Sequence, residues 1–229
     1  MTTASSPSDP AAKTAGGKRR RRAIPLATKH RPIQARGQDT FELILDVAGQ
    51  LLREIGFEQL TTNLICQRAG LTPPALYRYF PNKYAVLKEL GDRLMRAQDD
   101  EVLVWVAEGG LTGATFEERL AKSIAIQERM VAVHREFPGG IAIGRALRAV
   151  PLLNDLRIRS RDMVASAFAE TLRRQYPNTD ERRVQVACRL IVELGYSASE
   201  MVVEEPDRDA DIINREVCLM FARYLEHFD

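Results

Sequence analysis

The stretch LTTNLICQRAGLTPPALYRYFPNK, residues 60–83, contains two short segments with helical spacing of apolar residues on either side of a glycine. Thr61 or Thr62 is a suitable N-cap for the first segment, and Gly70 suits its end. The second segment starts with Pro73, at the helical position where a missing N–H costs nothing. Glycine permits a sharp turn because it adopts positive φ without a steric penalty. Two short helices joined in this way predict a helix-turn-helix.

Predicted helices flank this motif on both sides, because apolar residues recur every three or four positions. Asp39 and Glu42 have the spacing of a capping box, which predicts a helix start near Asp39. Gly56 suits the end of that helix, and Thr72 suits the cap of the second motif helix. The helices expected in this part of the chain are residues 39–56, 61–70, 73–79 and 82–106.

The rest of the sequence continues the helical pattern, and strand signals are nearly absent. Capping boxes at Thr115 and Glu118, and at Asn178 and Glu181, predict two further helix starts. We therefore expect an all-α chain of about nine helices, three in a head over residues 39–91 and six in a body over residues 92–229. The helices expected in the body after residue 106 are about 115–136, 141–149, 152–175, 180–203 and 209–227.

Composition narrows the class of protein. The 229 residues are 45% hydrophobic and 28% charged, enough to bury a core in one or two domains. The sequence has no run of about 18 apolar residues that would span a membrane, and residues 23–27 are too short for the core of a signal peptide. The expected location is the cytoplasm.

Enzyme and metalloprotein classes have little support in the sequence. Cys66, Cys188 and Cys218 are scattered among helical patterns, as are only three histidines, so we expect neither a disulfide framework nor a metal site. Glycine-rich phosphate loops and nucleophile-elbow motifs are also missing. We therefore predict no catalytic residues, no metal and no cofactor.

Positive charge is concentrated at the N-terminus. Residues 1–38 carry nine Lys or Arg and one Asp, whereas the whole chain has a net charge of only +2. We expect this segment to be a disordered basic arm, because it is rich in small polar residues and prolines. Such an arm suits a polyanion, either nucleic acid or an anionic membrane surface. A plain solubilising tail is the alternative, but the basic runs at 18–22 and 29–31 directly precede the helical head.

Residues 39–90 resemble the TetR family of bacterial transcription regulators. The resemblance rests on four motifs: GF at 56–57, LTT at 60–62, AGLT at 69–72 and LYRYFPNK at 76–83. It departs from the family at Cys66, where alanine is usual, and at Pro73 and Pro74, where small polar residues or glycine usually start the recognition helix.

A recognition helix meets base edges with its N-terminal residues. The residues expected against bases are Thr72, Pro73, Pro74, Ala75 and Arg78, with Arg78 the only long hydrogen-bond donor. The resemblance implies phosphate contacts at Thr62, Tyr77, Tyr79 and Lys83. Alternatives stay open, since the tyrosines could pack in the core, Lys83 could be a solvated surface residue and Thr62 could be the helix cap.

For the body, the resemblance implies a homodimer, formed by helices 180–203 and 209–227, and a small-molecule pocket. Candidate pocket residues are Trp105, Met130, His134, Phe137, Met163, Phe168, Glu193 and Tyr196. Ordinary core packing is the alternative for each of them. Glu193 is unusual because it lies in an apolar run, where Arg189 could be its partner.

The sequence therefore predicts a DNA-binding transcriptional regulator. We expect a homodimeric repressor that a small-molecule effector releases from a palindromic operator, and that associates with the nucleoid when bound. The alternative is an electrostatic protein that binds RNA or a membrane surface through its basic arm.

Overall fold

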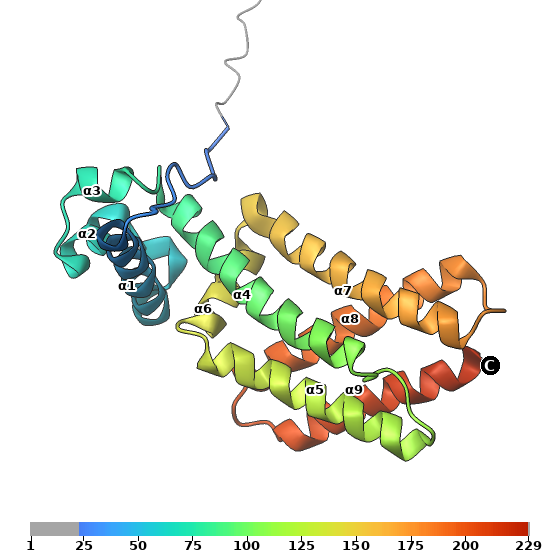
Figure 1. Ribbon diagram of the computed structural model, residues 1–229. Coiled ribbons are helices and arrows are strands. Elements are labelled where there is room, and N and C mark those ends of the chain that lie inside the picture. Colours follow the sequence, from blue (N-terminus) through green and yellow to red (C-terminus); the bar gives the residue numbers. More distant parts are fainter. Residues whose placement is uncertain (1–22, 229) are drawn as a thin grey trace, which may run out of the picture.

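The computed structural model describes residues 23–228, and this part of the chain is entirely helical, without strands (Figure 1). The nine α-helices found there match the expected number and order. The helices are α1 (Ala35–Gln59), α2 (Thr62–Ala69), α3 (Pro73–Tyr77), α4 (Lys83–Ala107), α5 (Phe116–Glu136), α6 (Gly140–Ala149), α7 (Asn154–Gln175), α8 (Glu181–Glu204) and α9 (Ala210–Leu225), with 3₁₀ turns η1 (Pro151–Leu153) and η2 (Glu226–Phe228).

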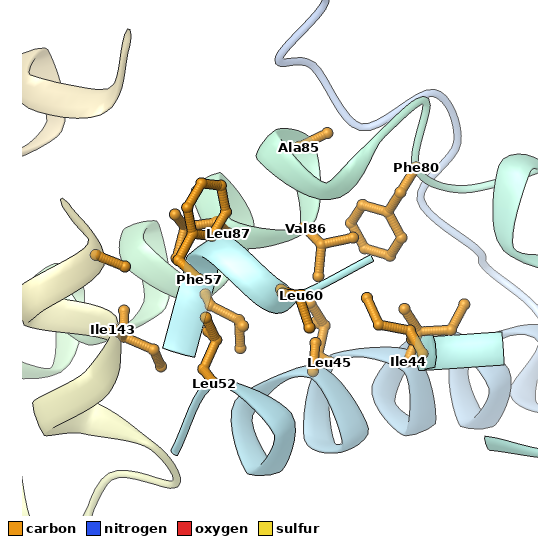
Figure 2. Packing of buried hydrophobic residues seen from close by; sticks show 14 of the residues in the cluster. Ile44, Leu45, Leu52, Phe57, Leu60, Phe80, Ala85, Val86, Leu87 and Ile143 are labelled. Atoms are coloured by element: carbon orange, nitrogen blue, oxygen red, sulfur yellow. The ribbon is translucent and has the colours of Figure 1, made fainter. Parts of the chain in front are cut away.

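The head consists of α1, α2, α3 and the first half of α4 around one apolar core. Phe41 of α1 stacks on Phe80, with 4.9 Å between ring centroids, and Leu60, Ile65 and Leu76 are fully buried. These contacts close the helix-turn-helix onto α1. Figure 2 shows the same core reaching the body, where Ile143 of α6 lies beside Phe57 and Leu87.

The body is a bundle of α4 to α9, and its C-terminal end lies far from the head (Figure 1). Helix α7 packs on α4 and α8, and α5 packs on α8 and α9. A second apolar cluster fills this bundle, with Val164, Leu172, Val184 and Cys188 at its centre.

Helix α6 joins the two parts. Leu147 of α6 is fully buried in the head cluster, and a Cβ atom at Gly91 of α4 would lie 2.7 Å from it. The turn before α6 is equally close to α1, since a Cβ at Gly139 would lie 2.7 Å from the carbonyl oxygen of Gly49. Because these approaches leave no room for movement of one part alone, a shift of α6 must move α1 and α4.

The structure corrects several expected boundaries. Helix α1 begins at Ala35 rather than Asp39, and Glu42 pairs with Arg93 of α4 instead of closing a capping box. Gly56, with φ of 72°, interrupts α1 where its end was expected. Asp180, not Asn178, caps α8. The proposed division at residue 91 falls inside the continuous helix α4, whose two halves belong to different cores.

The basic arm also differs from expectation in its described part. Residues 23–34 lack regular secondary structure but contact the head through hydrogen bonds, and residues 35–38 are helical. The expected disorder of residues 1–22, including the basic run 18–22, lies outside the described residues. No helix within 23–228 is both long and apolar enough to cross a membrane.

Candidate nucleic-acid interface and body cavity

Local hydrogen bonds define the helix-turn-helix. Thr61, rather than Thr62, caps α2, because its hydroxyl accepts a bond of 3.1 Å from the Leu64 N–H. Gly70 ends α2 with φ of 65°, a left-handed conformation that favours glycine. The Leu71 N–H then donates to the Cys66 carbonyl at 2.9 Å. These bonds fix the turn from which α3 starts.

Helix α3 has a buried side and an exposed side. Leu76 and Phe80 are fully buried in the head core, as the pattern predicts. Thr72, Pro73, Pro74 and Arg78 are exposed, and Ala75 is half-buried. The Thr72 hydroxyl makes no capping bond, and no carboxylate among residues 23–228 forms an ion pair with Arg78. One hydroxyl and one guanidinium on this surface are therefore available to an external acceptor.

Thr62 and Tyr77 form a polar pair on the same surface. Their hydroxyl oxygens lie 3.0 Å apart, which ties α2 to α3 across the turn. Tyr77 is 40% exposed, so its hydroxyl remains accessible. Hydroxyl groups held in this way are typical donors to phosphate oxygens.

Two of the expected phosphate contacts are corrected. Tyr79 is only 4% exposed and packs edge-on against Phe41, so its ring belongs to the core. The Lys83 ammonium donates to the carbonyl oxygens of Phe57 and Glu58, at 3.0 and 3.3 Å, and lies 4.4 Å from the Phe57 ring centroid. Lys83 therefore stabilises the C-terminal end of α1, a structural use that the sequence did not indicate.

The sequence also did not indicate a docked strap, defined here as residues 25–31. The Lys29 N–H donates to the Tyr79 carbonyl at 2.8 Å, and the Lys29 ammonium donates to the Tyr77 carbonyl at 3.1 Å. The Asn82 amide donates to the Pro25 carbonyl at 2.8 Å. The strap therefore lies along the end of α3 and the start of α4 (Figure 1).

Glu89 of α4 anchors the strap. Its carboxylate is 5% exposed and accepts both a bond of 2.9 Å from Arg31 and a bond of 3.4 Å from Thr28. Arg93 completes the site at 3.4 Å. A buried carboxylate requires such partners, because its desolvation is costly. Nothing in the helical pattern around Glu89 distinguishes it from a solvated residue.

The body contains an apolar cavity of about 80 Å³ between α4, α5, α7, α8 and α9. Four of the expected pocket residues line it: Trp105, Met130, Phe168 and Tyr196. The sequence analysis missed most of its other apolar lining residues, including Leu111, Ile126, Val164, Ile191, Phe221 and Leu225. These follow the same helical periodicity as ordinary core residues, so pattern alone could not distinguish them.

Polar groups in the cavity wall are already bonded within the chain. The Trp105 indole N–H donates to the Lys122 carbonyl at 3.1 Å, and the Tyr196 hydroxyl donates to Asp99 at 3.3 Å. The Gln127 amide donates to the Gly195 carbonyl and to the Ser199 hydroxyl, at 2.9 and 2.8 Å. The donors of these three side chains are used inside the protein, so the cavity is suited to an apolar molecule.

The other four candidates lie outside the cavity wall. His134 is buried against Gln98, with 2.8 Å between its Nδ1 and the amide nitrogen. Phe137 packs on the head core, and Met163 is 46% exposed on α7. Glu193 is half-buried and pairs with Arg189 at 2.6 Å, the partner that its spacing indicated.

A charged cluster lies behind Tyr196. Arg161, only 2% exposed, places its guanidinium carbon 3.7 Å from the Tyr196 ring centroid and lies 3.4 Å from Glu200. Glu200 also pairs with Arg148 of α6 at 2.8 Å. Burial raises the pKa of Asp99, against which Ser160 and Tyr196 donate hydrogen bonds. The cluster connects the cavity wall to α6.

The described residues show little that suits catalysis. Burial raises the pKa of the Cys188 and Cys218 thiols to about 12, which keeps them protonated and unreactive at neutral pH. Between residues 23 and 228, no group of three or more His, Cys, Asp or Glu residues is placed to hold a metal ion.

Helices α8 and α9 expose apolar side chains at intervals of about four residues. Such a stripe covers one face of each helix, and burial against a partner surface would remove it from water. The exposed members are Val186, Leu190, Leu194 and Met201 on α8, and Ile212, Met220 and Tyr224 on α9.

Comparisons with known proteins give a consistent result. A family model described as bacterial regulatory proteins, tetR family, matches residues 44–90, and one described as a tetracyclin repressor-like C-terminal domain matches residues 124–225. An uncharacterized HTH-type transcriptional regulator of Mycobacterium tuberculosis is 30% identical over 153 residues, 66% of this chain and 72% of that protein.

Two further proteins illustrate how far the similarity extends. The class C tetracycline repressor of Escherichia coli is 39% identical over 54 residues, 24% of this chain and 25% of the repressor, so the match spans about a quarter of that protein. The structure of a SmeT–triclosan complex superposes with a TM-score of 0.62 at 20% identity, over 82% of this chain and 91% of that one. The latter likeness shows the fold.

Proposed function

Because this chain belongs to the TetR family of bacterial transcriptional regulators, we propose that it is a homodimeric repressor that leaves a palindromic operator when a small apolar molecule fills its body cavity. The observation that carries the DNA-binding part is the exposed side of α3. There the Arg78 guanidinium and the Thr72 hydroxyl have no capping bond or ion pair among residues 23–228.

The proposed contacts with DNA fall into two groups. Arg78 and Thr72 donate to base edges in the major groove, and Pro74 and Ala75 offer apolar surface to a thymine methyl group. Thr62 and Tyr77 donate to phosphates, which set the register of the helix but carry no sequence information. Tyr79 and Lys83 are not part of this proposal, because both are used inside the head.

The apolar stripe of α8 and α9 supports the proposed dimer. Two copies that bury Leu190, Leu194 and Met220 against each other would form a four-helix interface around a two-fold axis. A two-fold dimer presents its two α3 helices to half-sites about 34–36 Å apart, which explains why the operator should be an inverted repeat. Such a regulator works in the bacterial cytoplasm and is associated with the nucleoid while bound.

The cavity supports an effector that is small, uncharged and apolar. Its wall is built mainly from aliphatic and aromatic side chains, and the Trp105, Tyr196 and Gln127 donors are bonded within the chain. A charged molecule would lose its hydration there without gaining a partner. The bound molecule in the SmeT complex, triclosan, is named as that protein's ligand, and we use it here only as a probe.

The route from cavity to DNA follows α6. A ligand that displaces Tyr196 disturbs Arg161 and Glu200, and Glu200 holds Arg148 of α6. Since α6 is in close contact with α1 and α4, its shift changes the orientation of the head. A ligand that favours this shifted state lowers the affinity for the operator by the same coupling free energy.

The proposal is tested with DNA from the region upstream of the protein's own gene. We expect the purified protein to bind this duplex at low salt, and an unlabelled copy to compete better than a scrambled duplex of equal length. Indole and triclosan should raise Tm and weaken DNA binding, whereas indole-3-carboxylate should do neither. Equal competition by the scrambled duplex would contradict the regulator, and a response to the carboxylate alone would contradict the apolar effector.

A further inference from the structure

The docked strap has a position that the helix-turn-helix does not require. It is attached to the recognition helix itself, because Lys29 bonds to the carbonyl oxygens of both Tyr77 and Tyr79. The His30 ring is also stacked on Tyr79, with 6.5 Å between centroids and 19° between planes. Leu26 packs against the head core. The strap is therefore fixed at the end of α3 through both backbone and side-chain contacts.

The anchor is an ion pair of unequal exposure. The Arg31 side chain is 65% exposed, whereas Glu89 is almost completely buried, so Arg31 reaches inward to neutralise a carboxylate in the head. The two bonds from one Arg31 nitrogen to the Glu89 oxygens measure 2.9 and 3.2 Å. Removing either partner leaves Glu89 under-neutralised or Arg31 without its acceptor, which weakens the docking of the whole strap.

The strap continues directly into the most basic part of the sequence. Lys18, Arg19, Arg20, Arg21 and Arg22 precede Ala23, the first described residue. A chain spans at most about 3.5 Å per residue, so five residues reach no more than about 17 Å from Ala23. Docking of the strap thus determines where on a bound duplex these five charges are available.

We propose that the strap positions the basic run 18–22 on the DNA that flanks each half-site, where it enters the minor groove. The inference rests on the proposed function, since it requires α3 to occupy the major groove. The DNA surface next to a helix in the major groove is the phosphate backbone and then the adjacent minor groove. Arginine side chains favour a narrow minor groove, as in A·T-rich sequence, because its negative potential is enhanced. The flank is therefore read by shape and charge.

The experiment compares two duplexes that share the same selected half-sites. The short duplex ends at the half-sites, and the long one adds an A·T-rich flank on each side. Four variants are compared with the wild type at about physiological salt. Serine replaces all five residues 18–22 in the first, and the others are Arg31→Ala, Glu89→Gln and Arg36→Ala. Arg36→Ala is the matched control, because it removes one exposed arginine near the strap that makes no ion pair there.

We expect the wild type to bind the long duplex about tenfold or more tightly than the short one, with a steeper salt dependence because additional charge is neutralised. The serine variant, Arg31→Ala and Glu89→Gln should lose most of this preference while binding the short duplex normally. Arg36→Ala should keep it. Replacing A·T by I·C pairs in the flank should preserve binding, since the minor groove is unchanged, whereas G·C pairs should weaken it.

Hydrogen exchange at the Lys29 amide reports docking separately, because its bond to the Tyr79 carbonyl exists only in the docked strap. Faster exchange in Arg31→Ala or Glu89→Gln, without loss of the flank preference, would overturn the proposal. Unchanged exchange in both variants would also overturn it, since the ion pair would not be the anchor. Failure of the wild type to prefer the short duplex over a scrambled one would instead refute the proposed function.

Discussion

Arg78 is the residue on which sequence-specific recognition depends in this account. It is the only long donor on the exposed side of α3, and no ion pair within residues 23–228 restrains it. We expect Arg78→Ala to cost about 1–3 kcal/mol of discrimination, because a bidentate contact to guanine is lost. The preference at one base pair of each half-site should relax while the rest of the operator is unchanged. Binding to a set of single-base operator variants measures this directly.

The control is Arg78→Lys, which keeps the charge but cannot form the two-pronged contact. It should retain the affinity for unrelated DNA and lose the base preference. An Arg78→Ala variant with an unaltered operator preference would show that another residue reads that base.

His134 makes stability depend on pH. Burial lowers its pKa below the usual 6.5, so the unfolded chain binds a proton more readily than the folded one. The stability that neutral His134 contributes is therefore present above pH 6.5 and is lost as pH falls toward its folded pKa. We expect Tm to fall between pH 7.5 and 5.5 in the wild type. In His134→Gln this dependence should be weaker.

His227 provides the comparison, because its side chain is exposed on η2. His227→Gln should show the same fall in Tm as the wild type. If His134→Gln instead kept the full wild-type fall, the pH dependence would come from other groups.

At the residue scale, the sequence predicts types of contact better than partners. The pairing of Glu193 with Arg189 follows from a local spacing of four residues, and it is found in the structure. The burial of Tyr79 and the use of Lys83 at the end of α1 depend on α1, which is distant in the sequence. Long-range packing decides such cases, and one sequence does not show it.

At the scale of elements, two threonines that flank the motif should behave differently. Thr61 caps α2 through its hydroxyl, whereas the hydroxyl of Thr72 makes no capping bond in α3. Thr61→Ala should therefore lower stability by about 1 kcal/mol. Thr72→Ala should leave stability nearly unchanged but weaken operator binding. Denaturation and DNA titration of the same two variants separate the effects, and equal destabilisation by both would contradict the assignment.

Helix starts with local caps are predictable, and those set by distant contacts are not. Thr61, Thr115 and Asn82 all cap helices at the expected positions, since each acts on an N–H three residues away. Helix α1 starts four residues early instead, because the capping-box partner Glu42 is bonded to Arg93 across the head. The strap was missed for the same reason, as its acceptors lie about fifty residues along the chain.

At the scale of the whole molecule, the apolar stripe predicts how copies associate. Leu190 and Leu194 are exposed on neighbouring turns of α8, so carboxylates at both positions would be buried unpaired in the proposed interface. We expect the double variant Leu190→Glu, Leu194→Glu to be monomeric in sedimentation and to bind one half-site weakly. Glu substitutions at the exposed positions Arg159 and Ser166 of α7 are a control that should remain dimeric. A double variant that stays dimeric would place the interface elsewhere.

The cavity shows the limit of sequence reasoning at this scale. Trp105, Met130, Phe168 and Tyr196 line it, but His134, Phe137, Met163 and Glu193 do not. All eight lie on helices of the body, and which side faces the cavity depends on how five helices pack together. Buried Arg161 illustrates the same limit, since the neighbouring Arg157 and Arg159 make it look like part of a solvated face.

The central claim is that a dimer of this chain reads a specific DNA sequence through α3. Selection from random duplexes by the purified protein, at about physiological salt to suppress non-specific binding, tests it most directly. The account predicts recovery of an inverted repeat whose half-sites are about 34–36 Å apart, and a shifted half-site sequence with Arg78→Ala. Recovery of no shared motif, with binding that vanishes as salt rises, would contradict it and favour purely electrostatic binding through the basic arm.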